Sequence, residues 1–330
     1  MKNIIERLVK IFISLILVTG TLAVLGWIIF GPAGKSSDFK TFVVPQDTKE
    51  FIIESELYKQ KLINNPKTFR FLLKTNVFGK EIKPGGYLLS NNMNMFKILA
   101  KITGKQDLLW FKLSYCPRKE QAGEYLAELL NWNSDQVNEW NNLYKNDKPE
   151  YFEGVYYPDT YLIPVSESPA QIAQRLINRY EEKFAPLSDK FISENVRWTT
   201  GLKIASLIAR EAGGENDIKL ISGIIWNRLN TGMRLQIDAT MQYTLGKKAD
   251  GSWWGPVSIS EKLNESAYNT YLHEGLPPTP ICSPSIEYME AALYPEETDC
   301  LFYLHDKDRQ IHCAKTYAGH LRNIEEFLKN

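Results

Sequence analysis

The chain has 330 residues, of which 44% are hydrophobic, 12% aromatic and 24% charged; this content excludes a disordered chain, and the length predicts two folding units or one elaborated unit. Its 39 basic side chains balance its 39 acidic ones, so the net charge is zero. Proteins that hold nucleic acid by its backbone need a positive surface, so no nucleic acid is expected as a partner.

The chain begins with a predicted transmembrane helix. Residues 11–30 carry no charged side chain, and this length allows a helix to cross a hydrocarbon layer of about 30 Å. A cleaved signal peptide is the alternative, but its apolar part is usually shorter and ends at a small-residue cleavage site, which this sequence lacks. Lys2, Arg7 and Lys10 precede the helix, so the positive-inside rule predicts that residues 1–34 form a cytoplasmic start and a single-pass anchor in the plasma (inner) membrane.

The remaining chain, with four cysteines, would then lie in an oxidising space, where the cysteines allow three pairings. Cys282, Cys300 and Cys313 are close in sequence, so one local disulfide among them is expected, whereas Cys116 is far from all three. Buried free thiols are the alternative. The sequence has no C-x-x-C pair, so it gives no support to a zinc site or a redox motif.

A small α+β module is predicted for residues 35–105. Residues 41–45 have the pattern of a strand, and a helical stretch is expected after Asp47. Residues 83–86 read Lys-Pro-Gly-Gly, which is typical of a tight turn. The module therefore contains strand, helix and turn signals within a short length.

The second helix of this module has clearer signals. Met95, Leu99 and Ile102 recur at helical spacing on one face. Asn92 is the expected N-cap, and Gly104 is expected to end the helix in a left-handed conformation.

Residues 106–330 are predicted to form a larger, mainly helical α+β domain, so the fold class is α+β. A strand is expected at residues 108–115. Ser168, followed by proline and then by glutamine three residues on, has the pattern of a capping box that begins a helix. Further helices are expected from residue 200 to 212 and after Asp217.

Glu211 is the strongest candidate for chemistry. It lies on the same helical stripe as Ile204, Leu207 and Ile208, so a carboxyl group occupies a place where an apolar side chain is expected. Burial of this kind raises the pKa of a carboxyl group and suits it to donate a proton near neutral pH, as glycosidase acids do. The alternative is that Glu211, in the last helical turn before Gly213, extends into solvent.

Polar side chains alternate with apolar ones at residues 234–240. If this segment is a strand, Gln236 and Asp238 share one face while Leu235 and Ile237 share the other. This pattern fits the rim of a sugar site, but it also fits any half-exposed strand. The aromatic side chains that could stack on sugars, or equally belong to the core, are Tyr243, Trp253, Trp254, Tyr268 and Tyr271.

The residues give no sign of a metal or an organic cofactor. His312 and His320 are eight residues apart, and no H-E-x-x-H pattern accompanies them. G-x-S-x-G, P-loop and dinucleotide-binding patterns are also missing from the sequence. We therefore expect no cofactor and no metal ion.

Several motifs in order resemble one family, the endolytic murein transglycosylases or YceG-like family. The segments that carry the resemblance are YPDTY at 157–161, ASLIAREAG at 205–213, IWNRL at 225–229, GMRLQIDAT at 232–240, YNTY at 268–271 and GLPPTPI at 275–281, followed by His312, Thr316, Tyr317, His320 and Asn323. The likeness extends to the anchor and to residues 35–105, which resemble the LysM-like module of that family. Residues 106–330 then resemble its catalytic domain.

The resemblance implies an activity on peptidoglycan. Members of the family cut the β-1,4 bond between MurNAc and GlcNAc inside glycan strands and leave 1,6-anhydro-MurNAc ends, which implies that the chain ends the elongation of nascent strands. Peptidoglycan strands and the membrane are the implied partners, with peptidoglycan synthases as further candidates. The implied enzyme is a lytic transglycosylase, a lyase acting on a polysaccharide.

The resemblance also implies site residues. Glu211 matches the catalytic acid and base, and one carboxyl group suffices because the C6 hydroxyl of the substrate is the nucleophile. The residues expected to form the surrounding polar groove are Gln236, Asp238, Thr240, Tyr268, Asn269 and Asn323. The sequence departs from the family in having Ala209 where a second glutamate is common, Ala239 in place of a proline, and Ser-Pro-Ser at 283–285 in place of Asn-Pro-Gly.

Two other functions stay open on the residues alone. A non-catalytic anchor that binds the wall would keep the first module and the aromatic side chains but would not need Glu211 on an apolar stripe. A scaffold of the wall-synthesis machinery would use the membrane helix for partner contacts, although residues 11–30 have no strong small-residue face beyond Gly20 and Gly26.

Overall fold

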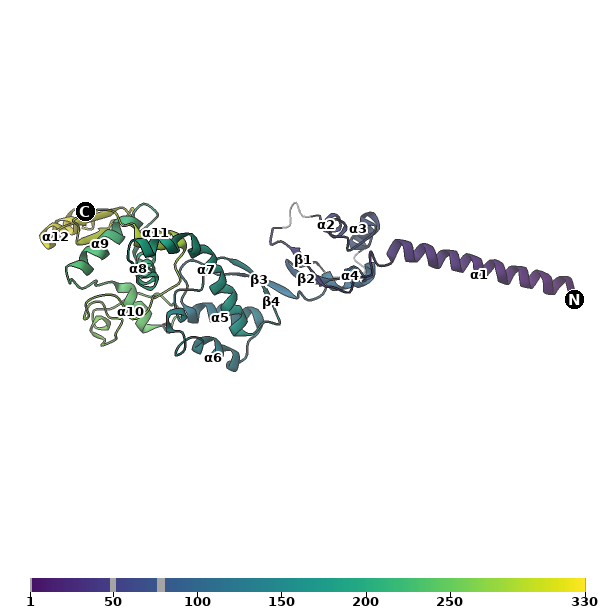
Figure 1. The fold of residues 1–330 in the computed structure, drawn as a ribbon, viewed down its shortest axis with the longest axis horizontal. Helices are drawn as coiled ribbons and strands as arrows, with labels where there is room; N and C mark the ends of the chain where they lie inside the picture. The colour runs from purple at the N-terminus through teal and green to yellow at the C-terminus, as the bar shows by residue number, and fades with distance from the viewer. Residues whose placement is uncertain (1, 48–51, 76–80, 330) are drawn as a thin grey trace. The chain divides into compact units, whose positions relative to one another are not determined.

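The structure is a computed structural model that describes residues 2–47, 52–75 and 81–329 (Figure 1). Its mixed α/β content confirms the coarse fold class. The chain forms two compact units, which we call the N-terminal unit and the C-terminal unit. The N-terminal unit comprises residues 1–111 and 161–166, and the C-terminal unit comprises residues 112–160 and 167–330.

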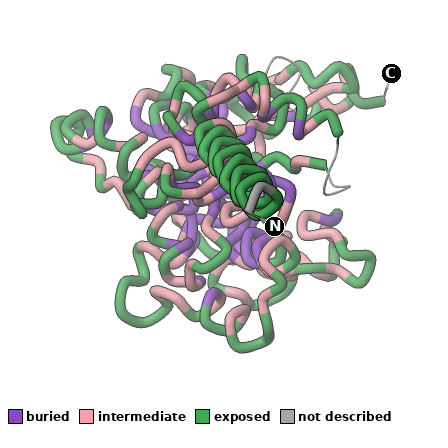
Figure 2. Tube along the Cα trace, turned by 90° about the vertical axis from the view of Figure 1, so that its right-hand side faces the viewer, coloured by how far each residue is buried: buried purple, intermediate pink, exposed green. Residues whose placement is uncertain are grey.

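The first helix, α1 (Lys2–Phe30), has the properties expected of a membrane span. Its segment Ile4–Phe30 has a mean hydropathy of 2.4, and in the part of the chain that the structure describes it is the one helix long and apolar enough to cross a bilayer. Its residues are exposed along most of its length, as the green colour of the helix in Figure 2 shows. An anchor and a signal sequence share these properties. The helix begins before the predicted residue 11, because the preceding turns also contain good helix formers.

A four-stranded sheet in the order β1-β2-β3-β4 lies in the N-terminal unit. Its strands are β1 (Lys40–Val44), β2 (Gly85–Leu89), β3 (Leu108–Lys112) and β4 (Thr160–Pro164). The pair β1 and β2 is antiparallel and places Phe42 opposite Tyr87, both fully buried. The strand predicted at 108–115 is thus present as β3 but ends earlier.

Three helices complete the N-terminal core: α2 (Ile53–Lys59), α3 (Pro66–Lys74) and α4 (Met95–Ile102). Part of the predicted helix after Asp47 falls on residues 48–51, which lie outside the described residues. Leu57, Phe69 and Ile98 from the three helices pack into one apolar cluster. Burial of this apolar surface stabilises the unit.

The ends of α4 differ from the prediction. The buried face is confirmed, but the N-cap is Asn94, whose Oδ1 accepts a hydrogen bond from the Lys97 backbone N–H at 2.8 Å. Asn92 instead accepts from the Ser90 hydroxyl at 2.6 Å, so it belongs to the preceding turn. Gly104 was expected to be left-handed and is not; the last turn closes through Thr103 in ordinary helical geometry.

The C-terminal unit is mainly helical. Its elements are α5 (Lys119–Leu130), α6 (Ser134–Asn142), η1 (Pro149–Tyr151), α7 (Pro169–Ser193), α8 (Trp198–Glu211), α9 (Ile218–Asn230), α10 (Asp238–Leu245), η2 (Glu261–Leu263), α11 (Ile286–Leu293), the antiparallel hairpin of β5 (Phe302–His305) and β6 (Ile311–Ala314), and α12 (Tyr317–Phe327). The centre of the unit is α8, which packs against α9, α10 and α11 (Figure 1). The predicted capping box of α7 is confirmed, with Ser168 and Gln171 bonded reciprocally.

Residues 234–240 do not form the strand considered from their sequence pattern. Gln236 adopts a left-handed conformation (φ 54°), and Asp238 begins α10 instead of continuing a strand. A distant segment causes this change, because the backbone N–H of Gln236 donates to the carbonyl of Thr270 at 3.0 Å and that of Ile237 donates to the Thr270 hydroxyl at 2.9 Å. The alternation of polar and apolar residues therefore does not place Gln236 and Asp238 on one strand face.

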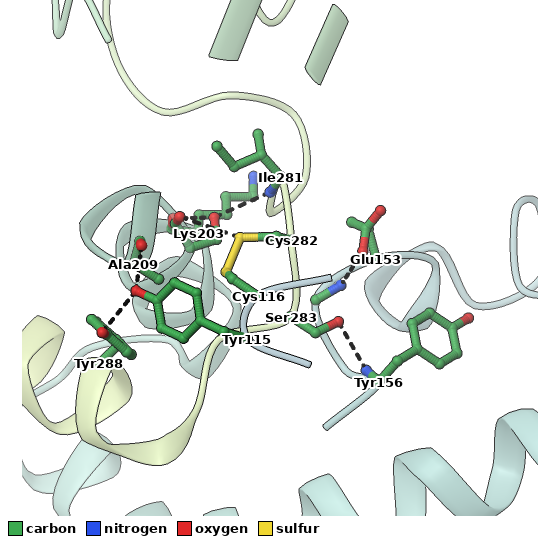
Figure 3. The surroundings of a disulfide bond; sticks show 12 residues. Tyr115, Cys116, Glu153, Tyr156, Lys203, Ala209, Ile281, Cys282, Ser283 and Tyr288 are labelled. Atoms are coloured by element: carbon green, nitrogen blue, oxygen red, sulfur yellow. Dashed lines mark hydrogen bonds between the residues drawn. A yellow bond between two sulfur atoms is a disulfide. The ribbon is translucent and has the colours of Figure 1, made fainter. Parts of the chain in front are cut away.

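All four cysteines form disulfides, so the alternative of free thiols is wrong. The expected local bridge joins Cys300 to Cys313, at the β5–β6 hairpin. The second bridge joins Cys116 to Cys282 across 166 residues of sequence and lies in the interior of the C-terminal unit (Figure 3).

Candidate active site

Glu211 is the last residue of α8, at the point where the chain turns sharply into α9. The side chain of Asp217 makes this turn: its carboxylate accepts hydrogen bonds from the backbone N–H of Gly213 at 2.8 Å and of Gly214 at 3.3 Å. The same carboxylate contacts Nε2 of His305 at 2.6 Å, which ties β5 to the turn. The end of α8 is thus fixed by residues from three elements.

The carboxyl group of Glu211 does not extend into solvent, which makes that alternative wrong. Its Oε2 accepts a hydrogen bond from the Tyr303 hydroxyl at 2.5 Å. Tyr303 lies on β5 opposite Cys313 of β6, and the Cys300–Cys313 disulfide closes this hairpin. A hairpin closed by a disulfide therefore positions Tyr303, which donates the hydrogen bond to Glu211.

The electrostatic surroundings suit a proton donor. Burial raises the pKa of Glu211 above its usual range, and the negative charge of Asp238 adds to this rise. The hydrogen bond from Tyr303 and the positive charges of His305 and Arg210 act against it without reversing the direction. A carboxyl group with a raised pKa keeps its proton to a higher pH than an exposed one, which suits a proton donor.

The partners of Asp238 differ from those of Glu211. Its Oδ1 accepts a hydrogen bond from the Tyr271 hydroxyl at 2.5 Å and forms an ion pair with Nζ of Lys262 at 2.7 Å. Lys262 also donates to the Tyr271 hydroxyl at 2.8 Å, so the three groups form a closed triangle. Asp238 is thus paired with a cation, whereas Glu211 forms no ion pair among the described residues.

Two of the predicted groove residues are buried. The hydroxyl of Thr240 lies 3.0 Å from that of Thr270, inside the protein. Asn269 is fully buried; its amide donates to the Lys262 carbonyl at 3.0 Å and its oxygen accepts from the Tyr271 backbone N–H at 2.9 Å. Both residues form buried hydrogen bonds to the segment that contains Lys262 and Tyr271, so they support the site from the interior of the protein.

The other predicted groove residues are spread more widely. Gln236 is exposed on its left-handed turn. Tyr268 is partly exposed, and its hydroxyl lies 2.8 Å from the Thr279 hydroxyl. Asn323 lies on α12 and donates to the Cys313 carbonyl at 3.3 Å, which fastens that helix to β6. Among the described contacts, none joins Asn323 to Glu211.

Sequence reasoning missed Tyr303, His305 and Lys262. A signal for the first two was present, because Tyr303 and His305 flank the buried Leu304 with the alternation of a half-buried strand. No pattern in the neighbouring sequence indicated Lys262, because only the folded chain brings it to Asp238.

A second buried carboxyl group, Glu153, was also missed. It has no exposed surface, and burial raises its pKa to about 7. Its oxygens accept hydrogen bonds from the backbone N–H of Lys119 at 3.1 Å and of Gly154 at 3.0 Å, and from the Tyr243 hydroxyl at 3.3 Å. It lies beside the segments joined by the Cys116–Cys282 disulfide (Figure 3). With three donors and no exposure, it is a structural group.

In the described ranges, no group of three or more histidine, cysteine, aspartate or glutamate side chains could hold a metal ion. His312 contacts Asp306 at 2.8 Å and stacks on Phe327, with ring centroids 3.6 Å apart. His320 stacks on Phe302 at 5.6 Å. Both histidines thus pack the C-terminal hairpin and helix.

Comparison with known proteins points to one family. The model of the YceG-like family matches residues 42–326. The endolytic murein transglycosylase of Bacillus subtilis (strain 168) is 25% identical over 318 residues, which cover 89% of this chain and 87% of that protein. The protein of the same name from Streptococcus pneumoniae serotype 2 is 30% identical over 180 residues, which cover 54% of this chain and 32% of its own length.

A solved structure agrees with these matches. The crystal structure of a YceG-like protein from Listeria monocytogenes superposes with a TM-score of 0.61 at 27% sequence identity. The alignment covers 87% of this chain and 99% of that one.

Proposed function

Because the chain belongs to the YceG-like family, we propose that it cuts the β-1,4 bond between MurNAc and GlcNAc inside peptidoglycan strands and leaves 1,6-anhydro-MurNAc ends. Its enzyme class is that of the lytic transglycosylases, which are lyases, and its relatives are named endolytic murein transglycosylases. The observation that carries the proposal is the carboxyl group of Glu211, held by Tyr303 at the end of α8 with a raised pKa.

In the proposed reaction Glu211 acts twice. It first gives its proton to the glycosidic oxygen, and the bond from that oxygen to C1 of the muramoyl residue breaks. The resulting carboxylate then takes the proton of the C6 hydroxyl as the C6 oxygen bonds to C1. Tyr303 supports the carboxylate between the two transfers, because its hydroxyl donates to Oε2. No water enters, so the product keeps the anhydro ring.

Asp238 and Lys262 are proposed to bind sugar hydroxyls beside Glu211. Their ion pair is partly exposed, with 48% of the Asp238 side chain and 28% of the Lys262 side chain open to solvent. Gln236 and Tyr268 are proposed as further contacts at the same groove, whereas Thr240, Asn269 and Asn323 are proposed to act through the loops they hold.

We propose that α1 is an uncleaved anchor and that the chain from residue 35 onward lies outside the cytoplasm. The two disulfides support this proposal, because disulfides persist in oxidising spaces. An anchored enzyme would reach strands near the membrane where they are made, so we propose that its cuts end nascent strands and that synthases are its partners. Reporter fusions after Lys35 test the topology: activity of a cytoplasmic reporter there would reverse it.

We further propose the domain division made from the sequence, with residues 1–34 as anchor, 35–105 as a LysM-like module and 106–330 as the catalytic domain. The module is proposed to hold glycan without cutting it, since its core is apolar and the buried carboxyl group of Glu54 is paired with Arg70. Deleting the module should weaken binding to sacculi and leave the product type unchanged.

Mass spectrometry of digested glycan strands tests the activity. Anhydro ends are lighter than hydrolysed ends by one water, so the two reactions are distinguished directly. Fragments with hydrolysed ends would show a hydrolase. Binding of strands without any fragments would instead favour a wall anchor or a scaffold.

A further inference from the structure

Arg210, next to Glu211 in the last turn of α8, forms no ion pair in the part of the chain that the structure describes, although its charge interacts with that of Glu211. Its Nε is buried without a hydrogen bond, and burial lowers the pKa of its guanidinium. The other arginines that are at least partly buried have hydrogen-bond acceptors: Arg118, Arg175 and Arg179 each form an ion pair with a carboxylate. Arg228 instead donates to the backbone carbonyls of Leu301 and Leu235. A buried guanidinium N–H without a hydrogen-bond acceptor is costly, so its retention beside the candidate acid calls for a ligand.

Trp254 holds this guanidinium. The central carbon of the Arg210 guanidinium lies 4.0 Å from the centroid of the Trp254 ring, which is partly exposed. The Trp254 carbonyl accepts a hydrogen bond from Gln242 at 3.3 Å, and Gln242 lies one helical turn after Asp238 on α10. Since α10 packs against α8, the stacked pair connects the helix that ends at Glu211 with the helix that begins at Asp238. Stacking uses only the face of a guanidinium and leaves the N–H groups at its edge available.

The free edge of a guanidinium suits a planar carboxylate, with which it forms two parallel hydrogen bonds. In peptidoglycan, carboxylates occur on the lactyl side of the muramoyl residue. One source is the stem peptide, and the other is the lactyl group itself where the peptide has been removed. Both lie on the sugar whose glycosidic bond Glu211 would act on.

We propose that Arg210, stacked on Trp254, binds a carboxylate carried on the lactyl side of the muramoyl residue while Glu211 acts on the glycosidic bond of that residue. This inference rests on the proposed function. It makes Arg210 a residue that selects where along the strand the enzyme binds, because only muramoyl residues carry that group.

The test measures binding by full-length protein that carries Glu211→Gln, so that no strand is cut. The probes are soluble glycan strands with stem peptides, strands stripped of peptides by an amidase, and both kinds after chemical amidation of their carboxyl groups. Adding Arg210→Gln should weaken binding of a carboxylate-bearing strand about tenfold, because a lost charge-assisted hydrogen bond is typically of this size. Arg210→Lys should lose less, since it keeps the charge. Arg197→Gln, at the other end of α8, is the matched control and should change nothing.

A loss with peptide-bearing strands identifies the stem peptide as the source, and a loss with stripped strands alone identifies the lactyl carboxylate. No loss with either kind, or an equal loss with the amidated strands, would overturn the proposal. Circular dichroism of each variant shows whether it is folded, and Arg210→Lys provides the second reading if Arg210→Gln is not. A wild-type protein that makes no anhydro ends would refute the proposed activity, while the binding measurement would still report on carboxylate recognition.

Discussion

The surroundings of Glu211 and of Glu153 differ although burial raises the pKa of both carboxyl groups. Glu153 is fully enclosed and accepts three hydrogen bonds, from two backbone N–H groups and a tyrosine hydroxyl. Glu211 keeps some exposed surface and accepts one side-chain hydrogen bond, from Tyr303. Each region also has its own disulfide, long-range at Glu153 and local at Glu211.

This difference shows that a raised pKa alone does not mark a catalytic acid. Glu153 has its donors supplied from within the protein and no route to a substrate, so it stabilises the packing of the C-terminal unit. Glu211 has one supporting side-chain donor and is partly exposed, which suits the proton transfer proposed for it. The comparison yields four predictions, given in order of decreasing effect.

The sharpest test is Glu211→Gln. Glutamine has nearly the same shape but can neither give nor accept the proton, and each such transfer contributes about 10² to 10⁴ in rate. Because one group performs both transfers, we expect a folded protein that binds glycan and makes no detectable anhydro ends by mass spectrometry. Glu215→Gln, past the turn at Gly213, is the matched control and should retain most activity. Cleavage by the Glu211 variant at nearly the normal rate would move the catalytic role to another residue.

The two disulfides should separate stability from activity. Replacing Cys116 and Cys282 together by serine removes a bond that closes a very long loop, with an expected loss of about 4–5 kcal/mol in the free energy of unfolding. Replacing Cys300 and Cys313 opens a short loop and should cost about 3 kcal/mol. Denaturant unfolding measures both.

Replacing Cys300 and Cys313 should also lower activity, because the hairpin that they close contains Tyr303. If both pairs reduced activity only in proportion to the unfolded fraction, the hairpin would have no part in holding Glu211.

Glu153→Gln should lower stability and leave the chemistry intact. All three partners of Glu153 donate, so an amide N–H₂ would face a donor, at a cost of about 2 kcal/mol. In the wild type the folded state holds its proton up to a pH of about 7, whereas the unfolded glutamate loses it near 4.5.

The contribution of Glu153 therefore makes the wild type less stable as the pH rises from 4.5 to about 7, by up to about 3 kcal/mol. Thermal melts across this range should show that decline in the wild type and a flatter profile in the variant. The structural role of Glu153 would be contradicted if stability declined equally with pH in the two proteins. It would also be contradicted if the folded Glu153→Gln variant made no anhydro products.

Tyr303→Phe should have the smallest effect. The Tyr303 hydroxyl favours the carboxylate form of Glu211, so its removal should raise the pKa of Glu211 further. Since the first step needs protonated Glu211, the alkaline limb of the pH–rate profile should shift to higher pH. The rate at the maximum of the profile should be several-fold lower. Tyr317→Phe, on an exposed tyrosine at the start of α12, should leave the profile unchanged. An unshifted profile in the Tyr303 variant would mean that this contact does not tune the acid.

The features predicted correctly from the sequence are those set by neighbouring residues. The apolar run of α1, the capping box at Ser168 and the buried stripe of α8 all depend on spacings of three or four residues. That periodicity also singled out Glu211, because a carboxyl group interrupts the stripe. Local patterns were less reliable at helix ends, where Asn94 caps α4 in place of Asn92.

Only the tertiary structure decided how the site is assembled. Tyr303 reaches Glu211 across 92 residues, Tyr271 reaches Asp238 across 33, and Cys116 pairs with Cys282 across 166. The same long-range contacts turned the expected strand at 234–240 into a turn and a helix, through bonds to Thr270. Hydrophobic periodicity records how each segment faces the core, whereas partners are chosen by which segments the packed core brings together, and that choice leaves no pattern in the local sequence.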